Sequence, residues 1–249
     1  NYVLRLDYPA YFPFLTNAKN EEARRRYWMA KQNEGGAENL KRLDEIFLLR
    51  KELASLYGLP SFAHYSLRRK MVGKPETVTK FLADVKTAVT EVEKKELEEL
   101  RAEKARETGK PLAQTSLRRW DVQYYQERVR SARYSVDQEQ LRKHFPTDKA
   151  VAFALELSQT LYGVRFTERK VAAWHEDVRF FRIDDASGCL VGQFYLDLYA
   201  RDTKRGGAWM DDAITRRNTE AGIQTPVAYL NCNFSRPVGN KPALFTHDE

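Results

Sequence analysis

The segment of the sequence that comes nearest to a metal-binding pattern is HEDVR, which starts at His175. Two histidines at positions i and i+4 of a helix share one face and bind zinc through neutral imidazole nitrogens. Here the fifth position is Arg179, which is permanently cationic and cannot ligate a metal. The other histidines, His64, His144 and His247, are isolated in the sequence. The sequence therefore predicts no metal ligands and no catalytic residues within this chain.

A pair of glycines, Gly206 and Gly207, follows Lys204 and Arg205. Glycine lets a backbone approach a ligand closely, and glycine-rich loops bind phosphate when they have the spacing of a P-loop or a dinucleotide-binding turn. Neither spacing is present, so local chemistry favours a tight loop after a strand. No serine or cysteine has the sequence context of an activated nucleophile.

The last four residues, from Thr246 to Glu249, have the sequence of a helix capping box. A hydroxyl and a carboxylate three residues apart each accept a hydrogen bond from the other's backbone N–H at the start of a helix. We interpret the chain as stopping within the first turn of a helix, as expected for a segment of a longer protein.

The first 163 residues have mainly helical periodicity. Apolar residues recur at intervals of three and four, and glycines such as Gly58 and Gly163 are typical stop signals. The pattern predicts helices at about 40–56, 61–73, 75–107, 120–131, 136–145 and 147–162. Thr147 is the predicted cap of the last helix. At the beginning, residues Tyr2 to Tyr8 alternate with a period of two and predict a short strand that Pro9 closes.

After Gly163 the period changes from 3.6 to 2. This pattern predicts strands at 178–183, 190–198 and 227–234, and the first two flank a hairpin signal. In the last strand the apolar face is formed by Ala228, Leu230, Cys232 and Phe234. The sequence therefore predicts a mainly α fold. Residues 1–163 form a helical region with a short strand at its start, and residues 164–249 contain a small antiparallel or mixed β-sheet.

Composition limits the class of protein. With 42% hydrophobic residues, the 249-residue chain can bury a core. No run approaches 18 apolar residues, no signal peptide opens the chain, and two cysteines give no disulfide framework, so we expect a cytoplasmic protein. The chain has 42 basic and 35 acidic residues, yet residues 151–249 contain 12 basic and 13 acidic residues. The basic excess lies in the helical part, where acids alternate with bases as on solvated helix faces.

Four sequence blocks occur in an order that identifies a known family. They are WDVQYY from Trp120, WHEDVR from Trp174, FYLDLYARDTKRGGAWMDD from Phe194 and PVAYLNCNFSRPVGNKPALFTHDE from Pro226. Together with LRKEL from Leu49 and YSL from Tyr65, they resemble the thimet oligopeptidase/oligopeptidase A family of zinc metallopeptidases over essentially the whole chain. The resemblance implies cleavage of short peptides in a deep cleft between two largely helical halves. In that family an HExxH zinc motif follows FTHDE, and this chain ends before it.

The resemblance therefore implies zinc in the intact enzyme and none in this segment, which we expect to be inactive alone. We predict that Gly206 and Gly207 of the loop, with Tyr229 and Asn231 of the last strand, border the cleft and bind substrate. An extended peptide that adds to a sheet edge is held by main-chain hydrogen bonds, which suits varied short peptides. Replacing Gly207 with valine is predicted to impair peptide cleavage more than folding.

The expected partners are short peptides and the missing C-terminal catalytic helices, with no nucleic acid and no membrane. An apolar face left uncovered by truncation would also allow self-association. Two alternatives stay open. One is a complete, non-catalytic helical binding module, and the other is a basic nucleic-acid-binding protein, for which a steep salt dependence of binding is the signature.

Overall fold

The computed structural model describes residues 3–135, 138–247 and 249. The chain divides into two compact units, one formed by Leu15–Ala132 and the other by Asn1–Phe14 together with Arg133–Glu249. We call them the helical unit and the sheet unit. The change from helices to strands falls at the predicted position, after residue 163, but the helix before it belongs to the sheet unit.

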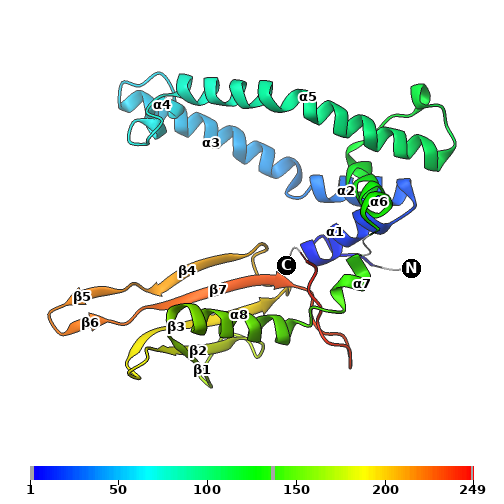
Figure 1. Ribbon diagram of the computed structural model, residues 1–249. Helices are drawn as coiled ribbons and strands as arrows, with labels where there is room; N and C mark the ends of the chain where they lie inside the picture. The colour runs from blue at the N-terminus through cyan, green and yellow to red at the C-terminus, as the bar shows by residue number, and fades with distance from the viewer. Residues whose placement is uncertain (1–2, 136–137, 248) are drawn as a thin grey trace. The chain divides into compact units, whose positions relative to one another are not determined.

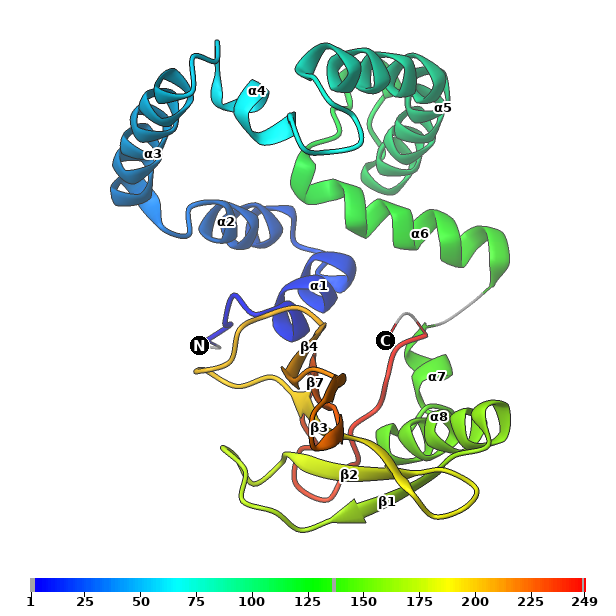
Figure 2. The same ribbon diagram turned by 90° about the vertical axis from the view of Figure 1, so that its left-hand side faces the viewer.

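The helical unit contains a long hairpin of two helices. In chain order its elements are α2 (Glu21–Gln32), α3 (Gly36–Leu56), α4 (Phe62–Leu67), α5 (Pro75–Thr108), the 3-10 turns η1 (Leu112–Gln114) and η2 (Arg119–Asp121), and α6 (Val122–Tyr134). Figures 1 and 2 show α4 joining one end of α3 to the start of α5. The predicted helices at 40–56, 61–73, 75–107 and 120–131 are confirmed, although α4 is shorter than expected. None of the described helices is long and apolar enough to cross a membrane.

A buried cluster of charges fixes α2 against the end of α5 and the start of α6. Arg24 Nη2 donates to Asp121 Oδ1 at 2.8 Å, and Lys104 Nζ donates to Asp121 Oδ2 at 2.6 Å. The exposed fractions of these three residues are 1%, 6% and 0% for Arg24, Lys104 and Asp121. The Arg24 guanidinium lies 4.3 Å from the ring centroid of Tyr124, which with Tyr125 is buried. The WDVQYY block is therefore part of the core of the helical unit.

The sheet unit is built on a mixed, five-stranded sheet in the order β1-β2-β3-β7-β4. Its strands are β1 (Arg165–Arg169), β2 (Arg179–Asp184), β3 (Leu190–Tyr199), β4 (Trp209–Ile214) and β7 (Val227–Phe234), and a separate two-stranded hairpin consists of β5 (Arg217–Thr219) and β6 (Gly222–Gln224). β3 and β7 are parallel, and the other neighbours are antiparallel. The predicted hairpin and last strand are confirmed as β2–β3 and β7, whereas β1, β4, β5 and β6 were not predicted.

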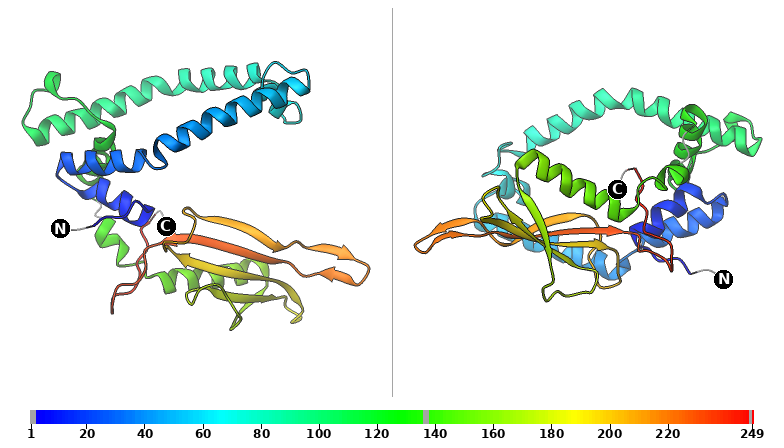
Figure 3. Two further views of the ribbon diagram at one scale, coloured as in Figure 1. Left: turned by 180° about the vertical axis from the view of Figure 1, so that it is seen from behind. Right: turned by 60° about the horizontal axis from the view of Figure 1, so that its bottom comes forward.

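Helix α8 (Thr147–Tyr162) covers one face of the sheet, as Figure 3 shows. Val151 and Leu155 of this helix pack against the core cluster formed by Phe181, Leu196, Leu198 and Cys232. The apolar face predicted for β7 is thus covered in part by the chain itself. Leu230 of β7 and Met210 of β4 remain exposed, at 39% and 74%.

The predicted strand at Tyr2–Tyr8 is wrong within the described residues. Helix α1 (Tyr8–Asn17) begins there instead. Asp7 accepts the amide of Ala10 with Oδ1 at 3.0 Å, and its carbonyl accepts the amide of Tyr11 at 2.8 Å. An aspartate in this position is a helix N-cap, and Pro9 falls in the first turn, where its missing N–H costs nothing.

Two other predicted helix starts differ from the structure. Thr147 is the first residue of α8 and not its cap, because its amide donates to the Ala243 carbonyl at 3.0 Å and Pro146 occupies the cap position. Helix α7 (Gln138–Arg142) lies where a helix was predicted from 136, but residues 136 and 137 are outside the described part of the chain. The capping box is confirmed as a pair of hydrogen bonds. The Thr246 amide donates to Glu249 Oε2 at 2.7 Å, and the Glu249 amide donates to Thr246 Oγ1 at 3.2 Å.

Candidate functional site

The sheet face opposite α8 is aromatic and polar. Because successive side chains of a strand point to opposite faces, Tyr195 of β3 and Tyr229 of β7 lie on this side. These two residues are paired in register, with ring centroids 5.7 Å apart. Trp174 contacts both rings, at 5.1 Å from Tyr195 and 5.6 Å from Tyr229, and is itself half exposed. This face can stay in contact with solvent without a covering helix, because these side chains combine apolar rings with polar ends.

A buried carboxylate, Asp197, holds the chain together where β3 ends. It is 1% exposed and accepts two hydrogen bonds from the Arg201 guanidinium, at 2.8 and 2.6 Å. Lys204 Nζ donates to Asp197 Oδ1 and to the Asp197 carbonyl, both at 2.8 Å, and to the Tyr199 carbonyl at 3.1 Å. Trp174 Nε1 donates to Asp197 Oδ2 at 3.0 Å. We call Asp197, Arg201, Lys204 and Trp174 the aspartate knot.

The electrostatics of the aspartate knot favour the ionised carboxylate. Burial alone acts to raise the pKa of Asp197, but the hydrogen bonds from Arg201, Lys204 and Trp174 and the charge of Lys204 outweigh it and lower the pKa to about 2. Burial lowers the pKa of Lys204, and its bond to Asp197 partly opposes that change. The group is fully paired, so it serves to shape the chain and has no free lone pair for acid–base chemistry.

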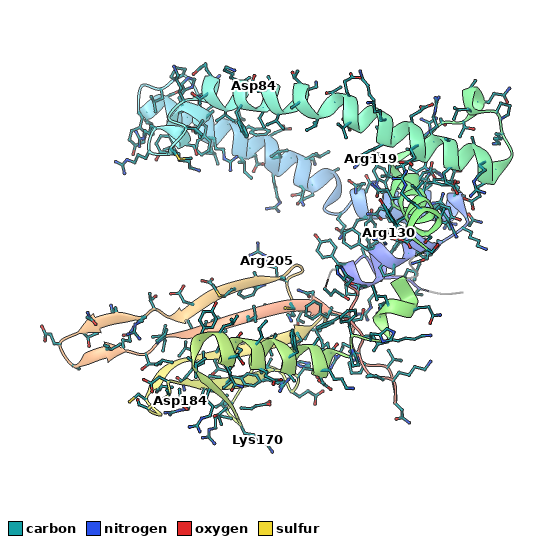
Figure 4. The ribbon with its side chains drawn as sticks, viewed as in Figure 1. Asp84, Arg119, Arg130, Lys170, Asp184 and Arg205 are labelled. Carbon is teal, nitrogen blue, oxygen red and sulfur yellow. The ribbon has the colours of Figure 1, made fainter. Side chains whose placement is uncertain are left out.

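The aspartate knot leads directly into the loop that contains Gly206 and Gly207. Gly207 has φ of +89°, a conformation that strains any residue with a side chain. Gly206 has an ordinary φ, and a Cβ atom there would lie 3.5 Å from the Tyr8 ring, which is normal contact. Asn233 Nδ2 holds the loop to β7 by donating to the carbonyls of Arg205, at 2.8 Å, and Gly207, at 2.6 Å. In Figure 4 the Arg205 side chain points away from the sheet.

The four predicted binding residues lie in one region of the sheet unit. Tyr229 and Asn231 are on the aromatic face of β7, and Asn233 of the same strand holds the loop of Gly206 and Gly207. Asn231 is only 4% exposed, so its side chain has almost no surface to offer a ligand. Whether the four residues bind substrate stays a prediction.

β7 is not the edge of the sheet. It pairs with β3 on one side and with β4 on the other, so its main chain has no free side for an added peptide. The end strand next to the loop is β4, and all six residues from Trp209 to Ile214 are exposed. Within the described chain, β7 is the neighbour of β4 and the far side of β4 carries no strand. This far side is an unpaired edge of the sheet, and β1 forms the other end strand.

Sequence reasoning missed the residues that build this region. It singled out the two glycines but not Trp174, Asp197, Arg201 or Asn233. The only signal was the spacing of Asp197 and Arg201, four residues apart, which is the spacing of an ion pair on a helix. Here it occurs at the end of a strand, where the chain turns back on itself.

The described residues do not gather a metal site. No group of three or more His, Cys, Asp or Glu side chains in the described ranges is placed to hold a metal ion. In the HEDVR segment, Asp177 accepts from Arg236 at 2.5 Å, and Arg179 makes two hydrogen bonds to Glu168, at 2.9 and 2.7 Å. These charges are used in ion pairs that fix the start of β2. The described residues therefore do not fit zinc.

Comparison with known proteins assigns the family. The family model for peptidase family M3 matches residues 14–249. Over the whole chain, the sequence is 45% identical to oligopeptidase A of Escherichia coli (strain K12), of which it spans 37%. It is 33% identical to two Arabidopsis thaliana proteins, the organellar oligopeptidase A of chloroplasts and mitochondria and the probable cytosolic oligopeptidase A, spanning 32% and 36% of them. The chain thus corresponds to about a third of each relative, and it belongs to peptidase family M3.

Proposed function

We propose that this chain is a segment of a zinc-dependent oligopeptidase that hydrolyses short peptides. The observation that carries the proposal is the 45% identity to an oligopeptidase A along the full chain, within a family match that covers residues 14–249. Since the described residues do not fit zinc, we assign the zinc ligands and the water-activating group to the part of the relatives' length that this chain does not span. Zinc would supply a Lewis acid and an activated water when bound there. The chain alone is then expected to be inactive.

The role of this segment in the proposed enzyme is to hold the substrate. β4 has a free edge, its six residues are exposed, and it begins two residues after Gly207. An extended peptide that pairs with β4 is gripped through main-chain atoms, so the grip does not depend on the peptide's side chains. The aromatic face with Trp174 and Tyr229 offers apolar surface to the side chains of a peptide bound at β4. Short peptides of varied sequence are the substrates that this arrangement suits.

The remaining parts of the proposal concern partners and location. We propose that the apolar surfaces left exposed on β4 and β7 are covered by helices of the full-length protein. A cytoplasmic location is supported by the name of the cytosolic Arabidopsis relative, although the organellar relative is equally similar by identity.

The activity is tested with the full-length protein and with this chain side by side. The full-length protein should cleave a quenched fluorescent peptide, lose activity after chelation and dialysis, and regain it with zinc. The chain alone should neither retain stoichiometric zinc nor cleave the peptide. Zinc retention with turnover by the chain alone would refute the assignment of the zinc ligands elsewhere, and an inactive full-length protein would refute the peptidase function.

The role of the loop is tested by two valine variants of the full-length protein, each of which places a side chain at a positive φ. Gly207 and Gly163 have φ of +89° and +64°, and neither has an atom within 4 Å of an added Cβ. Because φ is positive, Gly207→Val and Gly163→Val should each cost roughly 1–2 kcal/mol of stability. The prediction that Gly207→Val impairs peptide cleavage more than folding is therefore tested against a variant that shares the cost in folding. Only Gly207→Val should also lower kcat/KM. An equal effect of the two variants on kcat/KM would show that the loop does not approach the substrate.

A further inference from the structure

β7 contains a β-bulge beside the glycine loop. Asp197 pairs with Asn231, and Tyr199, two residues further along β3, pairs with Phe234, three residues further along β7. β7 therefore has one extra residue between these two pairs, in the step that contains Cys232 and Asn233. A bulge of this kind re-aims a side chain and occurs preferentially next to active sites. The bulge frees Asn233 from regular pairing with β3.

The side-chain amide of Asn233 uses both of its hydrogens on the loop. Nδ2 donates to the Arg205 carbonyl at 2.8 Å and to the Gly207 carbonyl at 2.6 Å. Both partners can only accept, so the NH₂ end of the amide must face the loop. One side chain thus bridges two carbonyls that are two residues apart, with Gly206 between them.

This bridge also determines where the loop amides point. Peptide units are planar, and no cis bond occurs in the described ranges, so the N–H of each unit points opposite to its C=O. The Arg205 carbonyl and the Gly206 N–H belong to one unit, and the Gly207 carbonyl and the Ala208 N–H belong to another. Since both carbonyls point to Asn233, the N–H groups of Gly206 and Ala208 point away from it. Two donors are therefore oriented together at the start of β4.

We propose that Asn233 is a positioning residue that presents the N–H groups of Gly206 and Ala208 to main-chain carbonyl oxygens of an extended peptide. The inference rests on the proposed function and adds a specificity to it. The loop carbonyls of Arg205 and Gly207 are occupied by Asn233 and cannot accept from the peptide, so the contacts made by the Gly206 and Ala208 N–H groups are to the peptide's carbonyls. A proline or an N-methylated residue is accepted at this position, because each keeps its carbonyl. A peptide in which that carbonyl is reduced to a methylene is not accepted, because it has lost the acceptor.

The start of the loop is held independently of Asn233. Lys204 Nζ binds the carbonyls of Asp197 and Tyr199, and Arg201 binds the Asp197 carboxylate. A change at Asn233 therefore releases the tip of the loop and leaves its base in place. This separation makes the proposal testable without unfolding the sheet.

The first experiment measures NMR backbone order parameters at residues 205–208 in this chain. Asn233→Ala removes both bonds, and Asn233→Asp places a carboxylate against two carbonyl oxygens. Each variant should lower the order parameters of the loop from the rigid range, about 0.85, toward the flexible range, below about 0.6, with the Asp197 segment unchanged. Asn218→Asp, on the exposed hairpin β5–β6, is the matched control. Order parameters that match the wild type in both Asn233 variants overturn the positioning role.

The second experiment measures peptide cleavage by the full-length protein. Asn233→Ala should raise KM about tenfold with little change in kcat, as expected when binding shared by ground state and transition state is lost. Asn233→Gln keeps a side-chain amide and should raise KM less than Asn233→Ala does. Two peptide series should be compared, in which each position in turn is either N-methylated or has its carbonyl reduced. At the position bound by this loop, only reduction of the carbonyl should impair cleavage. A more mobile loop with unchanged KM overturns the substrate role. An inactive wild-type protein contradicts the proposed function instead, whatever the order parameters show.

Discussion

Removing the carboxylate of Asp121 should strongly destabilise the helical unit. This side chain is fully buried and accepts hydrogen bonds from Arg24, from Lys104 and from the Arg118 amide, at 2.8, 2.6 and 3.0 Å. In Asp121→Ala the two cations would stay buried without their shared anion. Breaking a buried ion pair from one side typically costs about 3–5 kcal/mol, because the remaining charge is desolvated and unpaired.

The size of the expected shift follows from the size of the unit. For roughly 120 residues, an unfolding entropy of about 2.1 cal/mol/K per residue gives about 0.25 kcal/mol/K. A loss of about 3–5 kcal/mol then lowers the melting temperature of this unit by roughly 12–20 °C. Lys104 also has Glu21 at 3.0 Å, which remains as a partial partner and favours the lower end of this range.

The measurement is thermal unfolding combined with hydrogen exchange of α2 and α6, which reports on the helical unit separately. Asp121→Asn keeps the shape of the side chain and removes the charge, and it should have a similar effect if the charge is what matters. Glu22→Ala is the matched control, since Glu22 makes an ion pair with Arg25 on an exposed helix face, 60% and 44% exposed, where such pairs contribute little to stability, so the melting temperature should stay close to that of the wild type. A cost below about 1 kcal/mol for Asp121→Ala would refute the reasoning.

Two further predictions concern the sheet unit. The pKa of Asp197 falls from 3.8 to about 2 on folding, so its contribution of about 2 kcal/mol is present above pH 4 and is lost as the pH falls from about 4 to about 2. Thermal unfolding across this range should show that loss. Asp197→Asn should make the pH dependence shallower and leave the part that comes from other carboxylates with lowered pKa values, such as Glu168 and Asp184; a variant with the wild-type slope would contradict the prediction. Phe153, Leu157 and Leu161 on the outer side of α8 are 65%, 45% and 66% exposed, so the chain should self-associate with rising concentration, and Leu157→Glu should reduce this. Light scattering that shows a strict monomer at high concentration, together with cooperative unfolding above about 65 °C, would count against the prediction.

The sequence by itself determined the elements whose signals are local. Helices α3 and α5 follow from apolar residues at intervals of three and four, and α5 and α8 end at Gly109 and Gly163, which have φ of +66° and +64°. The hairpin β2–β3 and the bounds of β7 follow from a period of two and a turn signal. The family also follows from the sequence, because ordered blocks identify relatives without any knowledge of contacts.

Tertiary structure alone decided which of these elements meet. β4 and β5 are short and wholly exposed, so no apolar alternation marks them in the sequence. The position of β7 between β3 and β4, and the bulge that re-aims Asn233, depend on pairing with segments that are separate in the sequence. The aspartate knot likewise needs Trp174 brought from before β2 to the end of β3. Burial and hydrogen bonding between distant residues are properties of the folded chain, and no local pattern in the sequence encodes them.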